Sequence, residues 1–119
     1  MPEPNPELIQ TIKQRLEVLD ANIALASETS NRSVGEVLLL AVSKRQPLSI
    51  IEAAYACGLR TFGENYAEEA HEKIEQLAYL PEICWEMVGH IQSRKSTLVA
   101  ADFSRVHSLD SLKLARRLN

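Results

Sequence analysis

The chain has 119 residues, of which 45% are hydrophobic and 24% are charged, and its formal net charge at pH 7 is −3. This length supports one domain or part of one, and the apolar share is too high for a disordered tail. The acidic balance argues against non-specific binding to nucleic acid or to a membrane surface, and neither a membrane-spanning run nor a secretory signal is evident.

A long amphipathic helix is predicted at the start of the chain. Asn5 can cap this helix, and Pro6 suits its first position. Apolar residues then recur at spacings of three and four and form one stripe, made of Leu8, Ile12, Leu16, Leu19, Ile23 and Ala26. A polar, turn-like stretch over 28–35 follows, so residues 1–35 are expected to form an opening helix and loop.

Four strand–helix units are predicted in residues 36–119. Short apolar runs indicate strands over 37–42, 59–62, 85–88 and 103–106. The first run is continuously apolar, as in a strand that is covered on both faces. Helices are expected over 48–57, closed by Gly58, over 67–78, from Ser93 to about residue 100, and after a cap at Ser108 or Asp110. This alternation predicts an α/β fold with a parallel sheet.

Ligands of parallel α/β folds bind at the carboxyl ends of the strands. In this chain each predicted strand is followed by polar residues, which should meet at one rim. The residues concerned are Ser43, Lys44 and Arg45; Gly63, Glu64, Asn65 and Tyr66; Gly89, His90 and Gln92; and His107, Ser108 and Asp110.

Lys44 directly follows the most apolar run of the chain. A lysine held near the mouth of a barrel loses water, which disfavours the ammonium form and lowers its pKa. The neutral amine can then attack a carbonyl and form a Schiff base. The alternative is a strand-end lysine whose amine simply reaches solvent, which is a common arrangement.

The histidines and the other polar residues at the predicted rim can have either a functional or a purely structural role. His90 and His107 are candidates for general acid or base, or hydrogen-bonded rim histidines. Asn65 can orient a polar ligand or form a hydrogen bond within its own turn. Glu64 can act at the site or, equally, form an ion pair with a neighbouring basic group. His71 lies in a charged helical stretch and is interpreted as solvated surface.

The two cysteines, Cys57 and Cys84, form no CxxC pair. We expect two reduced thiols in a cytoplasmic protein, with a zinc site that includes nearby histidines as the alternative. The chain has no phosphate-binding GxxxxGK[ST] loop, no GxGxxG fingerprint, no HExxH and no GxSxG elbow, so nucleotide hydrolysis and serine-hydrolase chemistry are not expected.

Four segments in order resemble one known family. They are LLLAVSKRQP, RTFGENYAEEAHEKI, WEMVGHIQSRK and FSRVHSLDSLKLARRLN, and together they extend from about residue 37 to the C-terminus. These motifs resemble the YggS/PROSC family of pyridoxal phosphate (PLP) homeostasis proteins, and the N-terminal helix is similar to the opening helix of that family. The family more often has Asn at the position of Arg94, so no role is carried over to that residue.

The resemblance implies a (β/α) barrel of the TIM-barrel type, like the N-terminal domain of alanine racemase, which is fold-type III among PLP proteins. It implies that Lys44 binds PLP covalently as a Schiff base. It also places Asn65 near the cofactor ring and His90, in GHIQSRK, among the cofactor-binding candidates. The family is regarded as non-catalytic, and it is thought to hold PLP and to influence vitamin B6 and amino-acid balance. No catalytic and no metal-binding residue is therefore expected.

A complete eight-stranded barrel needs about 250 residues. Residues 1–119 are thus expected to be the N-terminal half of such a barrel, and the resemblance implies that the phosphate-binding loops lie in the other half. A half barrel leaves two open strand edges and an uncovered apolar face, so we expect self-association or pairing with a complementary C-terminal fragment. Truncation, a split protein and a barrel closed by two copies all remain open, although the abrupt end at Asn119 favours truncation.

Three functions are compatible with these features. The first is a PLP-binding homeostasis protein that uses Lys44, with its activity impaired if the chain is truncated. The second is a racemase-like enzyme, which needs a second acid or base across the substrate carbon. The third is a fragment that folds only on assembly and has no cofactor function. PLP is the expected small-molecule partner, and neither nucleic acid nor a membrane is expected as a partner.

Overall fold

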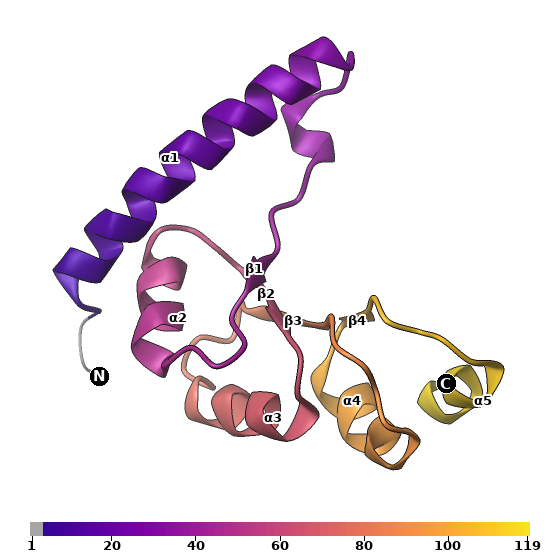
Figure 1. Ribbon diagram of the computed structural model, residues 1–119. Helices are drawn as coiled ribbons and strands as arrows, with labels where there is room; N and C mark the ends of the chain where they lie inside the picture. The colour runs from indigo at the N-terminus through magenta and orange to yellow at the C-terminus, as the bar shows by residue number, and fades with distance from the viewer. Residues whose placement is uncertain (1–3) are drawn as a thin grey trace. The chain divides into compact units, whose positions relative to one another are not determined.

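The computed structural model describes residues 4–119 and divides them into two compact units. One unit comprises residues 4–39 and 49–59, and the other comprises residues 40–48 and 60–119. The first unit contains the helix α1 (Pro6–Thr29), the 3₁₀ turn η1 (Val34–Glu36) and all but the first residue of the helix α2 (Leu48–Ala56). The second unit contains every strand (Figure 1).

The opening helix begins where the sequence predicts. The Asn5 side chain accepts a hydrogen bond from the Glu7 N–H at 2.8 Å, and Pro6 occupies the first turn. The apolar stripe is only partly covered, since Leu19 is 45% exposed. The thiol of Cys57 lies 3.4 Å from the carbonyl oxygen of Ile9 and donates a hydrogen bond to it. Gly58 has φ +100° and ends α2, as predicted.

The second unit has a four-stranded parallel sheet in the order β1-β2-β3-β4. This order confirms the predicted α/β class and the parallel sheet. The strands are β1 (Ala41–Val42), β2 (Thr61–Glu64), β3 (Cys84–Met87) and β4 (Arg105–Val106). The helices of this unit are α3 (Ala67–Gln76), α4 (Ser96–Asp102), which follows the 3₁₀ turn η2 (Ser93–Lys95), and α5 (Leu112–Leu118).

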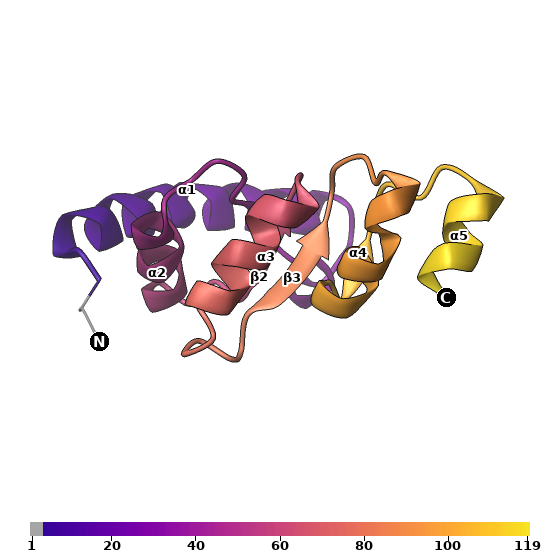
Figure 2. The ribbon, with the colours of Figure 1, turned by 90° about the horizontal axis from the view of Figure 1, so that it is seen from below.

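Helices α3 and α4 lie beside each other against the sheet, and α5 lies beside α4 (Figure 2). Met87, Ile91, Val99 and Leu114 are buried and form a core between β3, α4 and α5. On the neighbouring strands, Phe62 and Trp85 are in register, and their ring centroids are 5.9 Å apart. Burial of these large side chains supplies the main favourable free energy of folding in this unit.

The first strand differs from its prediction. Only Ala41 and Val42 of the run 37–42 are paired as a strand, and they pair with β2 alone. Instead of being covered on both faces, Val42 is 54% exposed and Leu38 is 65% exposed. Strand β1 is the outer strand of the sheet, and β2 is the one element within residues 4–119 that packs extensively against it, so these side chains lack the covering on both faces that was predicted.

Other predicted boundaries also shift. Strand β2 begins two residues later than predicted, so Gly63 and Glu64 lie inside it rather than after it. The cap of α5 is Ser111, whose hydroxyl oxygen accepts a hydrogen bond from the Leu114 N–H at 3.0 Å, and neither Ser108 nor Asp110 has that role. Ser93 opens a 3₁₀ turn before α4 and is not the helix cap.

Candidate functional site

The carboxyl ends of the four strands lie along one edge of the sheet because all the strands are parallel. Ser43 follows β1, Glu64 is the last residue of β2, and His107 directly follows β4. The predicted gathering of polar residues at one edge is therefore present in the second unit.

Lys44 lies in a tight turn directly after β1. The Gln46 N–H donates a hydrogen bond to the Ser43 carbonyl oxygen at 3.1 Å, so that Lys44 and Arg45 are the two central residues of a β-turn. Arg45 has φ +59°, which is the left-handed region that non-glycine residues seldom adopt. The Lys44 side chain is exposed and has no hydrogen bond or ion pair with the residues that the structure describes. Among the described residues, Lys44 is therefore accessible to water and does not have the dry environment that was expected for its amine.

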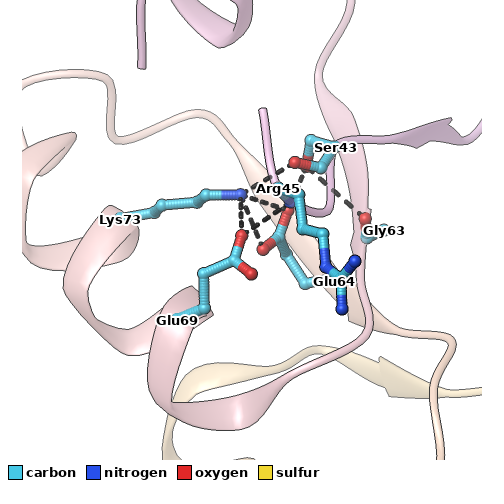
Figure 3. Close-up of polar contacts among 6 residues, drawn as sticks. All are labelled: Ser43, Arg45, Gly63, Glu64, Glu69 and Lys73. Carbon is cyan, nitrogen blue, oxygen red and sulfur yellow. Dashed lines mark hydrogen bonds and ion pairs between the residues drawn. The ribbon is translucent and has the colours of Figure 1, made fainter. Parts of the chain in front are cut away.

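A buried polar cluster lies beneath this turn (Figure 3). The Glu64 carboxylate is fully buried, and the Lys73 ammonium donates to its two oxygens at 2.9 and 3.1 Å. Lys73 also donates to the Ser43 carbonyl oxygen at 2.8 Å. The Ser43 hydroxyl donates to Glu64 Oε2. The charge of the carboxylate is thus compensated, as a buried charge requires.

Glu69 connects the same cluster to the far side of the turn. Its Oε2 accepts the Arg45 N–H at 2.8 Å and lies 2.6 Å from Lys73 Nζ. Partial burial acts to raise the pKa of the Glu69 carboxyl, but the hydrogen bonds from Lys73 and from the Arg45 N–H outweigh it, so the pKa lies below its ordinary value. Glu69 is therefore a carboxylate at neutral pH.

The Arg45 side chain stacks on an aromatic ring. Its guanidinium carbon is 5.4 Å from the centroid of Tyr66, and one of its nitrogens donates to the Tyr66 hydroxyl at 3.2 Å. Both residues are exposed, so this contact adds only a modest restraint on the turn.

Asn65 and His90 line one pocket of about 470 Å³ at the carboxyl ends of β2 and β3. Gln92, Arg94 and Lys95 also line it, whereas Lys44 does not. His90 is largely exposed, and its Nδ1 lies 3.5 Å from the carboxylate of Asp110. Of the three predicted cofactor-binding residues, the structure brings two together and leaves Lys44 on a separate turn.

The other two histidines are paired with carboxylates. His107 Nε2 lies 2.7 Å from Oε1 of the buried Glu86. His71, which was interpreted as solvated surface, has a side chain that is 39% exposed, and it also has two carboxylate partners: its Nδ1 lies 2.8 Å from Asp102 and its Nε2 lies 3.1 Å from Glu75. The hydrogen bond with Asp102 raises the pKa of His71 against the opposing effect of partial desolvation, and the charges of Asp102 and Glu75 raise it further.

Glu69 and Lys73 were not predicted as site residues, because they lie in a stretch interpreted as a charged surface. Two signals were present. The residues are four apart, which is the spacing of an ion pair on a helix. Lys73 also lies between Ala70 and Leu77 on the apolar face of α3, and both of these residues are buried.

The described residues were also compared with what a metal site or a membrane-spanning helix requires. Within residues 4–119 no group of three His, Cys, Asp or Glu side chains is arranged to hold a metal ion. Both cysteines are free. No helix among the same residues is long and apolar enough to cross a membrane.

Comparison with known proteins agrees with the motifs. No family model matches the chain. The pyridoxal phosphate homeostasis protein of Pseudomonas aeruginosa is 43% identical over 111 residues, which are 93% of this chain and 48% of that protein. The protein of the same name from Escherichia coli K12 is 43% identical over 99 residues, which are 82% of this chain and 42% of that protein.

The chain is a homologue of the pyridoxal phosphate homeostasis proteins.

The predicted resemblance is therefore confirmed, and this homologue spans about half the length of the curated relatives it matches. Solved structures agree. PipY of Synechococcus elongatus with PLP bound has a TM-score of 0.70 and 42% identity, covering 83% of this chain and 46% of that one. An unknown protein from Bifidobacterium adolescentis has a TM-score of 0.86 and 29% identity, covering 96% of this chain and 50% of that one.

Proposed function

We propose that this chain binds PLP through Lys44 and takes part in intracellular PLP, vitamin B6 and amino-acid homeostasis. The observation that carries the proposal is the exposed, unpartnered amine of Lys44 on a turn at the carboxyl edge of a parallel sheet. PLP is held covalently in proteins when a lysine amine condenses with its aldehyde and one water leaves. The residues present fit that aldehyde, because nothing within residues 4–119 occupies the amine.

The neighbouring pocket supports a second contact with the cofactor. Asn65 and His90 both line it, and both belong to segments that resemble family motifs. We assign Asn65 and His90 to polar contacts with PLP, since the pocket combines apolar side chains such as Met87 with polar groups, which suits an aromatic ring that carries polar substituents. Reversible covalent binding would keep a reactive aldehyde away from other amines and allow its release by exchange.

The same proposal covers the fold beyond the observed sheet. We propose that residues 1–119 are half of a PLP-binding barrel, with residues 1–35 as the opening helix and loop and residues 36–119 as four strand–helix units. A parallel sheet whose strands run in chain order supports this arrangement, as does the twofold greater length of the relatives. The missing phosphate contacts would then come from a second copy of the chain or from a complementary fragment.

The proposed role is non-catalytic and cytoplasmic. The curated relatives have names that describe homeostasis of PLP. The two free cysteines are consistent with a reducing compartment. A racemase-like reaction would need a second acid or base facing the substrate carbon, and addition of L- or D-alanine with PLP would reveal it as loss of optical activity.

Titration with PLP followed by visible absorption tests the proposal. We expect a new absorption band in the parent that is absent from Lys44→Ala and retained in Lys113→Ala, a matched control at an exposed lysine of α5. Reduction with borohydride should then fix the added mass on the peptide that contains Lys44. Equal spectra for the parent and Lys44→Ala would overturn the assignment of Lys44. Light scattering on the same samples reports whether binding accompanies association.

A further inference from the structure

We propose that Glu69 and Lys73 of α3, together with Glu64, are positioning residues that fix the turn carrying Lys44 and so set the place of its amine. The expected effect on PLP binding rests on the proposed function. The restraint on the turn is independent of that function. Within residues 4–119 the Lys44 side chain has no hydrogen bond or ion pair that would orient it, so its position depends on the two residues beside it.

Both neighbours of Lys44 are anchored to one cluster of charged side chains, made of Glu64, Glu69 and Lys73 (Figure 3). On one side, the Ser43 carbonyl oxygen accepts from Lys73 Nζ at 2.8 Å. On the other side, the Arg45 N–H donates to Glu69 Oε2 at 2.8 Å. Glu69 and Lys73 are one helical turn apart and are themselves paired at 2.6 Å. One face of α3 therefore holds the backbone on both sides of Lys44.

The conformation held in this way is an unfavourable one. Arg45 is the third residue of the turn and has φ +59°, where glycine or asparagine is usual. A non-glycine residue keeps such a conformation only when its surroundings determine it, and such residues cluster at functional sites. The bond from the Arg45 N–H to Glu69 is the one polar contact of this backbone group among the described residues.

The anchor on the Ser43 side is buried, Glu69 on the Arg45 side is partly exposed, and Lys44 is exposed. Glu64 is fully buried and Lys73 is 7% exposed, so water competes little for their hydrogen bonds. The arrangement combines a turn whose backbone is held in place with a lysine whose amine is exposed. Reversible capture of an aldehyde requires this combination, because the amine stays accessible while the direction of its approach is restricted.

Replacement of Glu69 tests the inference with little risk to folding, because Lys73 keeps its bonds to Glu64 and Ser43. We would compare Glu69→Ala with Glu72→Ala, an exposed carboxylate on the same helix that has no bond to the turn within residues 4–119. The first measurement is amide hydrogen exchange by NMR. Exchange of the Arg45 and Gln46 amides should accelerate about tenfold in Glu69→Ala and stay unchanged in Glu72→Ala.

The second measurement is PLP affinity, from the absorption titration described above. We expect Glu69→Ala to weaken binding about three- to tenfold. Glu69→Gln should restore most of the affinity and of the exchange protection, since an amide oxygen still accepts the Arg45 N–H. If Glu69→Ala acted through a general loss of stability, amide exchange would accelerate throughout the second unit and not only at Arg45 and Gln46.

The outcomes separate the two proposals. Unchanged exchange at Arg45 and Gln46 in Glu69→Ala overturns the restraint, whatever happens to PLP. Faster exchange with unchanged PLP affinity, while Lys44→Ala abolishes binding, overturns the positioning role. Faster exchange together with PLP binding that survives Lys44→Ala contradicts the proposed function and leaves the restraint on the turn supported.

Discussion

Single residues decide whether the buried cluster under the Lys44 turn is stable. Glu64 and Lys73 compensate each other inside the second unit, where an unpaired charge is strongly unfavourable. Their pairing is weak evidence of net stabilisation, because removing both charges from water has its own penalty. Removing one member of the pair is strongly destabilising, because it leaves the other charge buried without its partner.

Replacement of Lys73 by Met should lower the free energy of unfolding by about 3–5 kcal/mol. The physical reason is that the Glu64 carboxylate would remain buried, and within residues 4–119 its one remaining hydrogen-bond partner would be the Ser43 hydroxyl. Urea unfolding followed by circular dichroism measures the change. The double variant Glu64→Gln/Lys73→Met should recover part of the loss, and a double variant less stable than Lys73→Met would contradict this account.

His71 gives the stability a pH dependence with a definite sign. The folded pKa is raised above the unfolded value of 6.5, so protonation of His71 favours the folded state. This contribution is fully present below about pH 6.5 and is lost as the pH rises through the folded pKa. Parent and His71→Gln should therefore differ in stability at about pH 5.5 and converge at about pH 8.5. A difference that is equal at both pH values would show that His71 does not act through its charge.

Glu69 has the opposite pH dependence. Its folded pKa is depressed, so its contribution is present above the unfolded value of 4.5 and is lost as the pH falls through the folded pKa. The stability difference between the parent and Glu69→Gln should shrink as the pH is lowered from about 6 to about 3. Glu72→Gln is the control, for which we expect no comparable change.

At the level of secondary-structure elements, the segments that follow β2 and β3 are in close backbone contact at Asn65 and Gly89. A Cβ atom on Gly89 would lie 2.4 Å from the backbone oxygen of Asn65 and 2.7 Å from its Cα. Both neighbours are backbone atoms, so no side chain can move away to make room. The absence of a side chain at Gly89 therefore sets the position of Asn65 at the edge of the pocket.

Gly89→Ala should destabilise the second unit by about 1–3 kcal/mol and displace Asn65. Gly35→Ala is a suitable control, because its Cβ would have ordinary contact with the Ser33 hydroxyl at 3.6 Å. Thermal unfolding measures the first effect, and PLP titration reports the second. Stability equal to that of the parent would mean that the backbone at Asn65 yields more easily than the structure indicates.

At the level of the whole molecule, the sheet has two unsatisfied edges within residues 4–119. Strands β1 and β4 each pair with a single neighbour. Leu109 and Leu112 of the same unit are 54% and 67% exposed. Open edges and exposed apolar side chains both promote association. This is the physical basis for expecting a second copy or a complementary fragment.

We predict concentration-dependent self-association in solution, measured by size-exclusion chromatography with light scattering. Val42→Lys places a charge on the outer strand β1 and should shift the equilibrium toward the monomer. Thr97→Lys adds the same charge at an exposed position of α4 and should leave it unchanged. A parent chain that stays monomeric at all concentrations would exclude self-association and favour a complementary partner.

Local patterns in the sequence were sufficient for the order of elements, the parallel α/β class, the cap at Asn5 and the end of α2 at Gly58, because propensity, capping and apolar periodicity act over a few residues. The four sequence motifs were sufficient to identify the relatives of the chain. The tertiary structure decided the rest. It placed Lys73 and Glu69 under the turn, paired His71 with Asp102, and exposed β1 at an outer edge. These features depend on which residues distant in sequence meet in space, and on which neighbours a strand has, and no local pattern contains that information.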